Sequence, residues 1–89
     1  MKITITEEED RTPRTWSIWA DGRYSGYVIL TLDGMSLVWK GAWISSDGSE
    51  TVVRLTTPPS FSQAVAAARE LVLIIQRDGS LKPFQPTVP

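Results

Sequence analysis

Apolar and polar residues alternate through the first two thirds of the chain, and the spacing then changes to that of a helix. A period of two places successive side chains on opposite faces of a strand, whereas a period of 3.6 lines up one face of a helix. The alternation predicts strands over Met1–Thr6, Trp16–Ala20, Tyr24–Leu32, Leu37–Ser45 and Thr51–Thr56. The helical spacing predicts one helix between Ser60 and Gly79, with an apolar stripe formed by Phe61, Ala64, Val65, Ala68, Leu71, Val72 and Ile75.

Three Asp-Gly dipeptides separate the predicted strands: Asp21-Gly22, Asp33-Gly34 and Asp47-Gly48. A tight hairpin turn of type I′ needs positive φ at both central residues, which Gly adopts freely and Asp tolerates. Each dipeptide therefore predicts a hairpin between the strands on either side. Together they predict an antiparallel meander.

The predicted fold class is α+β: an antiparallel four- to five-stranded β-meander followed by one C-terminal α-helix packed on one face. Residues 1–80 would form a single domain, and residues 81–89 a proline-rich C-terminal tail. Within this tail, Pro83-Phe84-Gln85-Pro86 matches the PxxP pattern of polyproline ligands. The pattern is short, and a structural or unstructured tail is the favoured interpretation.

The turns also predict which residues share a face of the sheet. A two-residue loop at Asp21-Gly22 places Trp16 opposite Tyr27, and directly opposed residues share a face. A two-residue loop at Asp33-Gly34 places Val28 opposite Trp39. One face would then collect Trp19, Tyr24, Val28, Leu30, Leu32, Met35, Leu37, Trp39 and Trp43. The other face would collect Trp16, Ile18, Tyr27, Ile29, Val38, Ala42 and Ile44.

Both predicted faces are apolar, although a single helix can cover only one of them. The second face could be covered by Met1–Thr6 together with the 81–89 tail, by a second copy of the chain in a homodimer, or by another partner. Large exposed apolar surfaces usually mark interaction sites. The pattern therefore leaves three alternatives, and two of them are interfaces.

Composition narrows the classes of chemistry. The 89 residues contain no Cys and no His, and the formal net charge is −1. The commonest general base and the commonest metal ligands are therefore missing, and no cofactor or metal site is expected. The charge disfavours direct binding of nucleic acid through phosphate neutralisation. No apolar run is long enough to span a membrane, so we expect a cytoplasmic protein that is not an enzyme.

Four aromatic residues, Trp19, Tyr24, Trp39 and Trp43, are candidates for partner binding. Aromatic side chains on a sheet can stack on the bases of a single strand of nucleic acid. Such platforms normally carry several Lys and Arg residues, and here only Arg23, Lys40 and Arg54 lie nearby in the predicted register. Packing in the core is the favoured alternative, since aromatic side chains bury more apolar area than any others.

The acidic run Glu7, Glu8, Glu9 and Asp10 is the second candidate for partner binding. Four adjacent carboxylates in a loop could imitate the phosphates of a nucleic acid and dock on a basic partner. The alternative is a solvated connector between strands, which is the commoner use of such runs. Consecutive residues of an extended segment point in alternating directions, so a metal site is disfavoured.

The layout of residues 1–79, a strand meander followed by one helix in a short chain, resembles small phage-encoded inhibitors of the anti-CRISPR type. The resemblance rests on architecture and not on a sequence motif. It implies a non-enzymatic module that blocks a basic nucleoprotein complex of the host cytoplasm, with Glu7–Asp10 as the docking element. The layout is also similar to single-stranded DNA binders that dimerise through their helices. A small structural or assembly protein is the third class.

Overall fold

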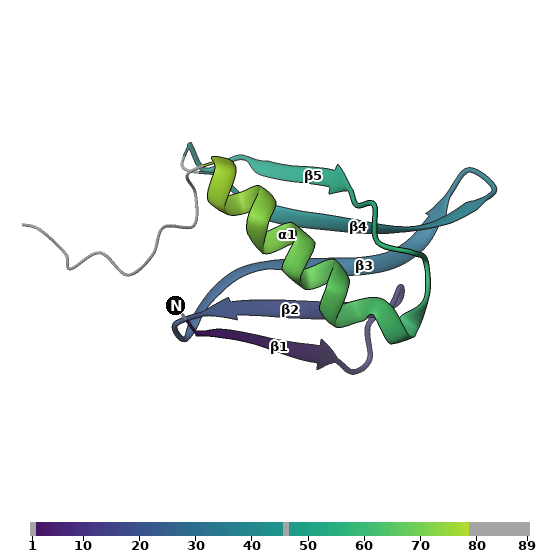
Figure 1. The fold of residues 1–89 in the computed structure, drawn as a ribbon, viewed down its shortest axis with the longest axis horizontal. Helices are drawn as coiled ribbons and strands as arrows, with labels where there is room; N and C mark the ends of the chain where they lie inside the picture. Colours follow the sequence, from purple (N-terminus) through teal and green to yellow (C-terminus); the bar gives the residue numbers. More distant parts are fainter. Residues whose placement is uncertain (1, 46, 79–89) are drawn as a thin grey trace, which may run out of the picture.

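A computed structural model describes residues 2–45 and 47–78 and confirms the predicted α+β fold. One five-stranded antiparallel sheet is followed by one helix that crosses it diagonally (Figure 1). The elements are β1 (Ile3–Glu8), β2 (Thr15–Ala20), β3 (Arg23–Asp33), β4 (Ser36–Ile44), β5 (Glu50–Arg54), a 3-10 turn η1 (Phe61–Gln63) and α1 (Ala64–Asp78). The predicted stop at Gly79 and the 81–89 tail, including Pro83-Phe84-Gln85-Pro86, lie outside the described residues.

The strands follow one another across the sheet in the order β1-β2-β3-β4-β5. β1 is therefore an edge strand, and the prediction that Met1–Thr6 folds back over the second face is wrong. Each strand is joined to the next by a short connection, so the register is set by turn chemistry. The sheet edges are β1 and β5.

The first Asp-Gly turn forms as predicted, and the second is shifted by one residue. Asp21 and Gly22 both have positive φ, as a type I′ turn requires, and Ala20 pairs with Arg23. In the next hairpin Asp33 stays in the strand and pairs with Ser36. Only Gly34 of the two loop residues has positive φ, which is the requirement of a type II′ turn with Gly first. Leu30 therefore pairs with Trp39, two residues from the predicted register, and the face of each residue is unchanged.

A β-bulge at Ser25 overturns part of the predicted face assignment. Trp19 pairs with Tyr24, but Ile18 pairs with Gly26, so Ser25 is an extra residue in β3. The extra residue reverses the alternation. Beyond the bulge, Trp16 pairs with Val28 and not with Tyr27. The prediction that Trp19 and Tyr24 share a face with Trp39 is therefore wrong.

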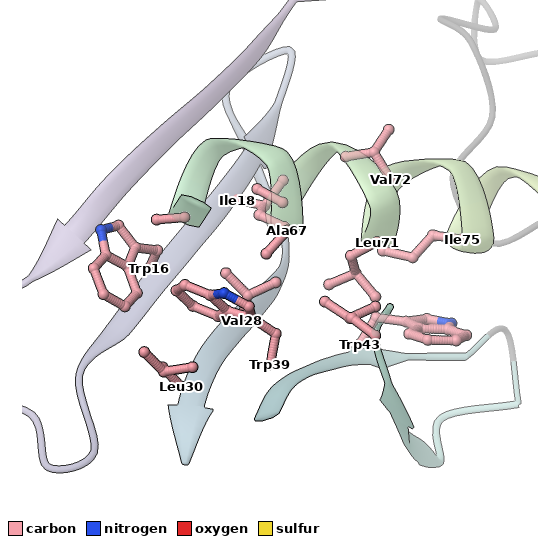
Figure 2. Packing of buried hydrophobic residues seen from close by; sticks show 13 residues of the cluster. Trp16, Ile18, Val28, Leu30, Trp39, Trp43, Ala67, Leu71, Val72 and Ile75 are labelled. Atoms are coloured by element: carbon pink, nitrogen blue, oxygen red, sulfur yellow. The ribbon is translucent and has the colours of Figure 1, made fainter. Parts of the chain in front are cut away.

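The core lies between α1 and the face that carries Trp16, Ile18, Val28, Leu30, Trp39 and Trp43 (Figure 2). Trp16 and Trp39 meet edge to face with ring centroids 5.2 Å apart. The Trp39 indole N–H donates to the carbonyl of Pro58 at 3.0 Å, which satisfies its polar group within an apolar environment. Figure 2 shows Leu71 and Ile75 of α1 directed toward the sheet beside Trp43.

Small residues let α1 approach the sheet closely. Ala67 and Ala68 are fully buried, and Leu71 sits directly on the bare backbone of Gly41. A Cβ atom at Gly41 would lie 2.6 Å from Leu71 Cδ1. The predicted stripe is confirmed for the positions that face the sheet: Ala64, Ala68, Leu71, Val72 and Ile75. It is wrong for Phe61 and Val65, which are about half exposed.

Glu70 attaches α1 to the segment that follows β5. Its two carboxylate oxygens accept hydrogen bonds from the backbone N–H and the hydroxyl of both Thr56 and Thr57, at 2.7–3.0 Å. Partial burial of the carboxyl opposes its ionisation, but the hydrogen bonds together outweigh this effect and lower the pKa of Glu70. The ionised carboxylate thus holds the connection in the position from which α1 begins.

Gly26→Ala should destabilise the domain by about 1–3 kcal/mol, because the new Cβ would overpack the sheet. It would lie 2.5 Å from the carbonyl oxygen of Ala42, and neither strand can move without breaking the ladder. Urea unfolding followed by tryptophan fluorescence measures the change. Ser25→Ala is the control, and it should stay within about 0.5 kcal/mol of wild type. Equal unfolding midpoints for Gly26→Ala and wild type would contradict the close approach of β3 and β4.

Glu70→Gln should lower the free energy of unfolding at pH 7 by about 1 kcal/mol, because the hydrogen bonds lose their charged acceptor. The pKa of Glu70 is lowered in the folded state, so its contribution is complete above the ordinary value of 4.5 and is lost as the pH falls below it. The difference between variant and wild type should therefore shrink in acid. The exposed Glu9→Gln is the matched control. A difference that is the same at pH 7 and pH 3 would contradict this role.

Candidate protein-binding surface

The sheet face opposite α1 is not covered by any element of the described chain (Figure 1). We call it the open face. The register assigns it residues from all five strands: Thr4, Thr6, Glu8, Thr15, Ser17, Trp19, Tyr24, Tyr27, Ile29, Thr31, Asp33, Ser36, Val38, Lys40, Ala42, Ile44, Glu50, Val52 and Arg54. Aromatic and β-branched residues dominate this set, as expected for a sheet surface that packs against something.

The largest exposed apolar side chains of the open face gather at the end near the β2–β3 turn. Trp19 and Tyr24 meet edge to face with centroids 5.6 Å apart. On β4, Ile44 lies toward the same end and is 60% exposed, and on β5 Val52 lies in the central row with Tyr27 and Ala42 and is 57% exposed. Tyr24 is 53% exposed. Four large apolar residues from four neighbouring strands therefore share this exposed face. We call them the patch, and leaving their apolar surface in water is costly.

Tyr27 forms the centre of the open face and lies across β4. Its hydroxyl donates to Glu50 Oε1 at 2.8 Å, so its ring spans the row that contains Ala42. This position explains why Ala42 is buried although no helix covers it. The hydrogen bond to Glu50 raises the pKa of Tyr27, because it stabilises the protonated phenol. Burial raises the pKa of Tyr24.

Charges of both signs surround this apolar centre. Asp33 lies 3.9 Å from both Lys40 Nζ and Arg54 Nη1, and the three side chains occupy the end of the face near the β3–β4 hairpin. Glu8 accepts a hydrogen bond from Ser17 at 2.7 Å on the side of β1. On the side of β5, Glu50 accepts the Tyr27 hydroxyl. The positive and negative groups are close to balanced, so this surface has no strongly basic or acidic character.

The predicted aromatic site is divided between the two faces. Trp39 and Trp43 are buried under α1, where they can bind no partner, and their assignment to a binding site is corrected. Trp19 and Tyr24 remain on the surface, because the bulge turns them to the open face. The predicted register assumed an even period of two from Tyr24 onward, and it therefore did not separate the two pairs. The interruption by two small residues, Ser25 and Gly26, is the signal in the sequence for a bulge at this point.

The predicted acidic site is also divided. The prediction that Glu7–Asp10 forms one loop is wrong, because β1 continues through Glu8 and only Glu9 and Asp10 lie in the turn. Glu7 forms an ion pair with Arg14 at 2.6 Å at the rim of the helix-covered face. Glu8 points to the open face. The run therefore places its carboxylates in three different environments and does not form a single charged patch.

Arg14 explains why Glu7 is held at that rim. Its guanidinium lies over the ring of Phe61, 4.3 Å from the centroid, and 5.1 Å from the centroid of Trp16. Cation–π contacts and the ion pair together fix the side chain at the start of η1. Glu7, Arg14 and Phe61 thus pack over the buried Trp16 at one end of the core, so Glu7 has a structural role.

Other exposed apolar residues are scattered. Leu32, Met35 and Leu37 lie on the β3–β4 hairpin, which extends past the ends of β2 and β5 (Figure 1). A shallow groove beside it is lined by Leu37, Val38, Arg54, Leu55, Thr56, Thr57, Pro58 and Pro59. Val65 and Leu73 are exposed on the outer side of α1. None of these groups joins as many strands as the open face.

Comparisons with protein-family models, with curated proteins and with solved structures found no match. Within residues 2–45 and 47–78, no group of three or more Asp or Glu side chains is placed to hold a metal ion. No helix in that same part of the chain is long and apolar enough to cross a membrane. The function therefore has to be inferred from the surface itself.

Trp19→Phe should remove most of the acrylamide-quenchable tryptophan fluorescence. Trp19 is 36% exposed, whereas Trp16, Trp39 and Trp43 are each at most 7% exposed. Trp16→Phe is the control and should leave quenching almost unchanged. An unbroken strand without the bulge would turn Trp16 to the open face instead. A fall in quenching for Trp16→Phe and none for Trp19→Phe would therefore contradict the observed register.

Proposed function

We propose that this protein is a non-enzymatic protein-binding module whose binding surface is the open face of the sheet. The observation that carries the proposal is the patch formed by Trp19, Tyr24, Ile44 and Val52 on four neighbouring strands. Exposed apolar side chains gathered on one sheet face, with polar residues around them, are typical of a protein interface. The absence of His and Cys from the sequence fits a binding role better than a catalytic one.

A protein partner fits this surface better than nucleic acid. The aromatic side chains Trp19, Tyr24 and Tyr27 could stack on bases, but such binding also needs a basic groove along the strand. Lys40 and Arg54 both lie against Asp33, which offsets their charge. Glu8 and Glu50 flank the face on its two sides. A balanced surface would gain little from the release of counterions, so single-stranded nucleic acid is the weaker candidate.

The architectural resemblance to anti-CRISPR inhibitors stays a prediction. An inhibitor of a basic nucleoprotein complex would need a concentrated negative surface, and the run from Glu7 to Asp10 is divided by pairing with Arg14 and by strand alternation. Glu9 and Asp10 remain as exposed acidic residues in the β1–β2 turn. Within the proposed class, an assembly protein of the cytoplasm fits the open face more simply than an inhibitor that depends on this run.

The double variant Ile44→Lys/Val52→Lys tests the proposal, because it places two charges within the patch at positions that are exposed in the free chain. Its stability should stay close to that of wild type, since neither residue belongs to the core. The measurement is affinity capture followed by quantitative mass spectrometry, and a differently tagged copy of this chain counts as a captured protein. A protein retained by wild type should be retained at least about tenfold less by the double variant, since each buried charge would remain unpaired.

The matched control is Val65→Lys/Leu73→Lys, which adds the same charges to exposed apolar positions on α1. It should retain the same protein as wild type. Loss of binding in the α1 variant with no loss in the open-face variant would place the binding surface on the helix. If every captured protein is retained equally by the open-face variant and the α1 variant, a protein-binding role for the open face is refuted.

A further inference from the structure

We infer that the open face binds the open face of a second copy of this chain, in a two-fold symmetric dimer with the axis parallel to β3. The inference rests on the proposed function and names the partner of the same surface. The choice of a second copy as the partner depends on where the large, small and charged side chains lie on the open face. Three rows of residues, each running across the five strands, carry the argument.

The first row contains a charge at each edge of the sheet. It runs Glu8, Thr15, Ile29, Lys40 and Arg54 from β1 to β5. The second row runs Thr6, Ser17, Tyr27, Ala42 and Val52. The third combines Thr4, Trp19 and Tyr24, which pair across β1, β2 and β3, with Ile44 and Glu50, which pair across β4 and β5 two residues from Ala42 and Val52. In each row the β3 residue lies at the middle, and it is apolar or aromatic.

A rotation of 180° about an axis parallel to β3 places each row opposite the same row of the second copy. In this arrangement β1 faces β5 of the second copy, and β2 faces its β4. Glu8 then faces Arg54 of the second copy, and Trp19 faces Ile44 of the second copy. Ile29 faces its own equivalent. Because a two-fold interface repeats every contact, this arrangement contains two Glu8–Arg54 pairs and two Trp19–Ile44 contacts.

The arrangement also fits in shape. Tyr27 stands between Ser17 and Ala42, two small residues that are buried even in the free chain. The ring of the second Tyr27 can therefore pack beside the first in the space of about 10 Å that separates two packed sheets. Glu8, Glu50 and Arg54 lie on the edge strands β1 and β5, and among these three rows only Lys40 on β4 places a charge inside them, so the interface would have a mainly apolar centre and a polar rim.

The perpendicular axis fits less well. A rotation about an axis across the strands would pair Arg54 with Glu50 of the second copy, but it would place Lys40 opposite Ile44 and Glu8 opposite Thr4. An ammonium group would then be buried against an aliphatic side chain without a new partner, which is unfavourable. The axis parallel to β3 pairs Glu8 with Arg54 and places Lys40 opposite the polar Thr15 of the second copy, so the position of Lys40 favours this axis.

The area of the open face determines how tightly two copies should bind. Five strands about 4.8 Å apart and about six residues of about 3.3 Å each span roughly 24 by 20 Å. Two such faces bury about 1,000 Å² in total, which is below the standard range of about 1,200–2,000 Å² and typical of a weak, transient interface. We therefore expect a dissociation constant in the micromolar range and not an obligate dimer.

Charge exchange between Glu8 and Arg54 tests the geometry. Sedimentation of wild type over a range of about 1 µM to 1 mM should show a monomer–dimer equilibrium. Glu8→Arg alone and Arg54→Glu alone should each weaken the dimer about tenfold, because both symmetric pairs become repulsive. A mixture of the two variants should restore association as a one-to-one dimer, since opposite charges then meet at both pairs. The double variant Glu8→Arg/Arg54→Glu should also dimerise.

Two variants control for net charge: Glu9→Arg, one residue beyond Glu8 in the turn, and Arg69→Glu, which is exposed on α1. Both should dimerise like wild type. A wild-type chain that stays monomeric up to about 1 mM, or a mixture no stronger than either variant alone, overturns this inference. The chain could be monomeric while the open-face variant Ile44→Lys/Val52→Lys fails to retain a captured protein other than this chain. In that case the proposed function stands, and only a second copy is excluded as the partner.

Discussion

The bulge at Ser25 is the constraint from which the core and the candidate surface both follow. One extra residue in β3 shifts the pairing of β2 with β3 by one position between Trp19–Tyr24 and Ile18–Gly26. On one side of this point Trp16 and Ile18 join Trp39 and Trp43 under the helix. On the other side Trp19 and Tyr24 turn outward. Without the bulge the core would lose two large residues, and the open face would lose its exposed aromatic pair.

The second constraint is the single helix, which can cover only one face of a five-stranded sheet. Ala67, Ala68 and the Leu71–Gly41 contact bring α1 close to the strands, and the Glu70 carboxylate fixes where it starts. These contacts pack α1 tightly against one face of the sheet, so a short chain can form a well-buried core there. They also leave the opposite face in solvent with Ile44 and Val52 more than half exposed. The proposal of an interface follows from this asymmetry.

Much of the fold could be predicted from the sequence, because it depends on local signals. Alternation located the five strands, the 3.6 spacing located α1, and the Asp21-Gly22 dipeptide determined its turn. The site could be predicted only in part, because it depends on register. Gly34 occupies the first position of a type II′ turn, and Ser25 is an extra residue that a strict period of two does not allow for. Ion pairing of Glu7 with Arg14 depends on a strand pairing that the run of four acidic residues conceals.

Isotope-filtered NMR on a mixture of labelled and unlabelled chains would test whether the open faces of two copies meet. If they do, intermolecular contacts should join the Ile44 methyl groups to the Trp19 ring, and Ile29 to its equivalent in the second copy. Contacts that arise only from Val65 and Leu73 on α1, or from the β3–β4 hairpin, would place the interface elsewhere and contradict the pairing of open faces.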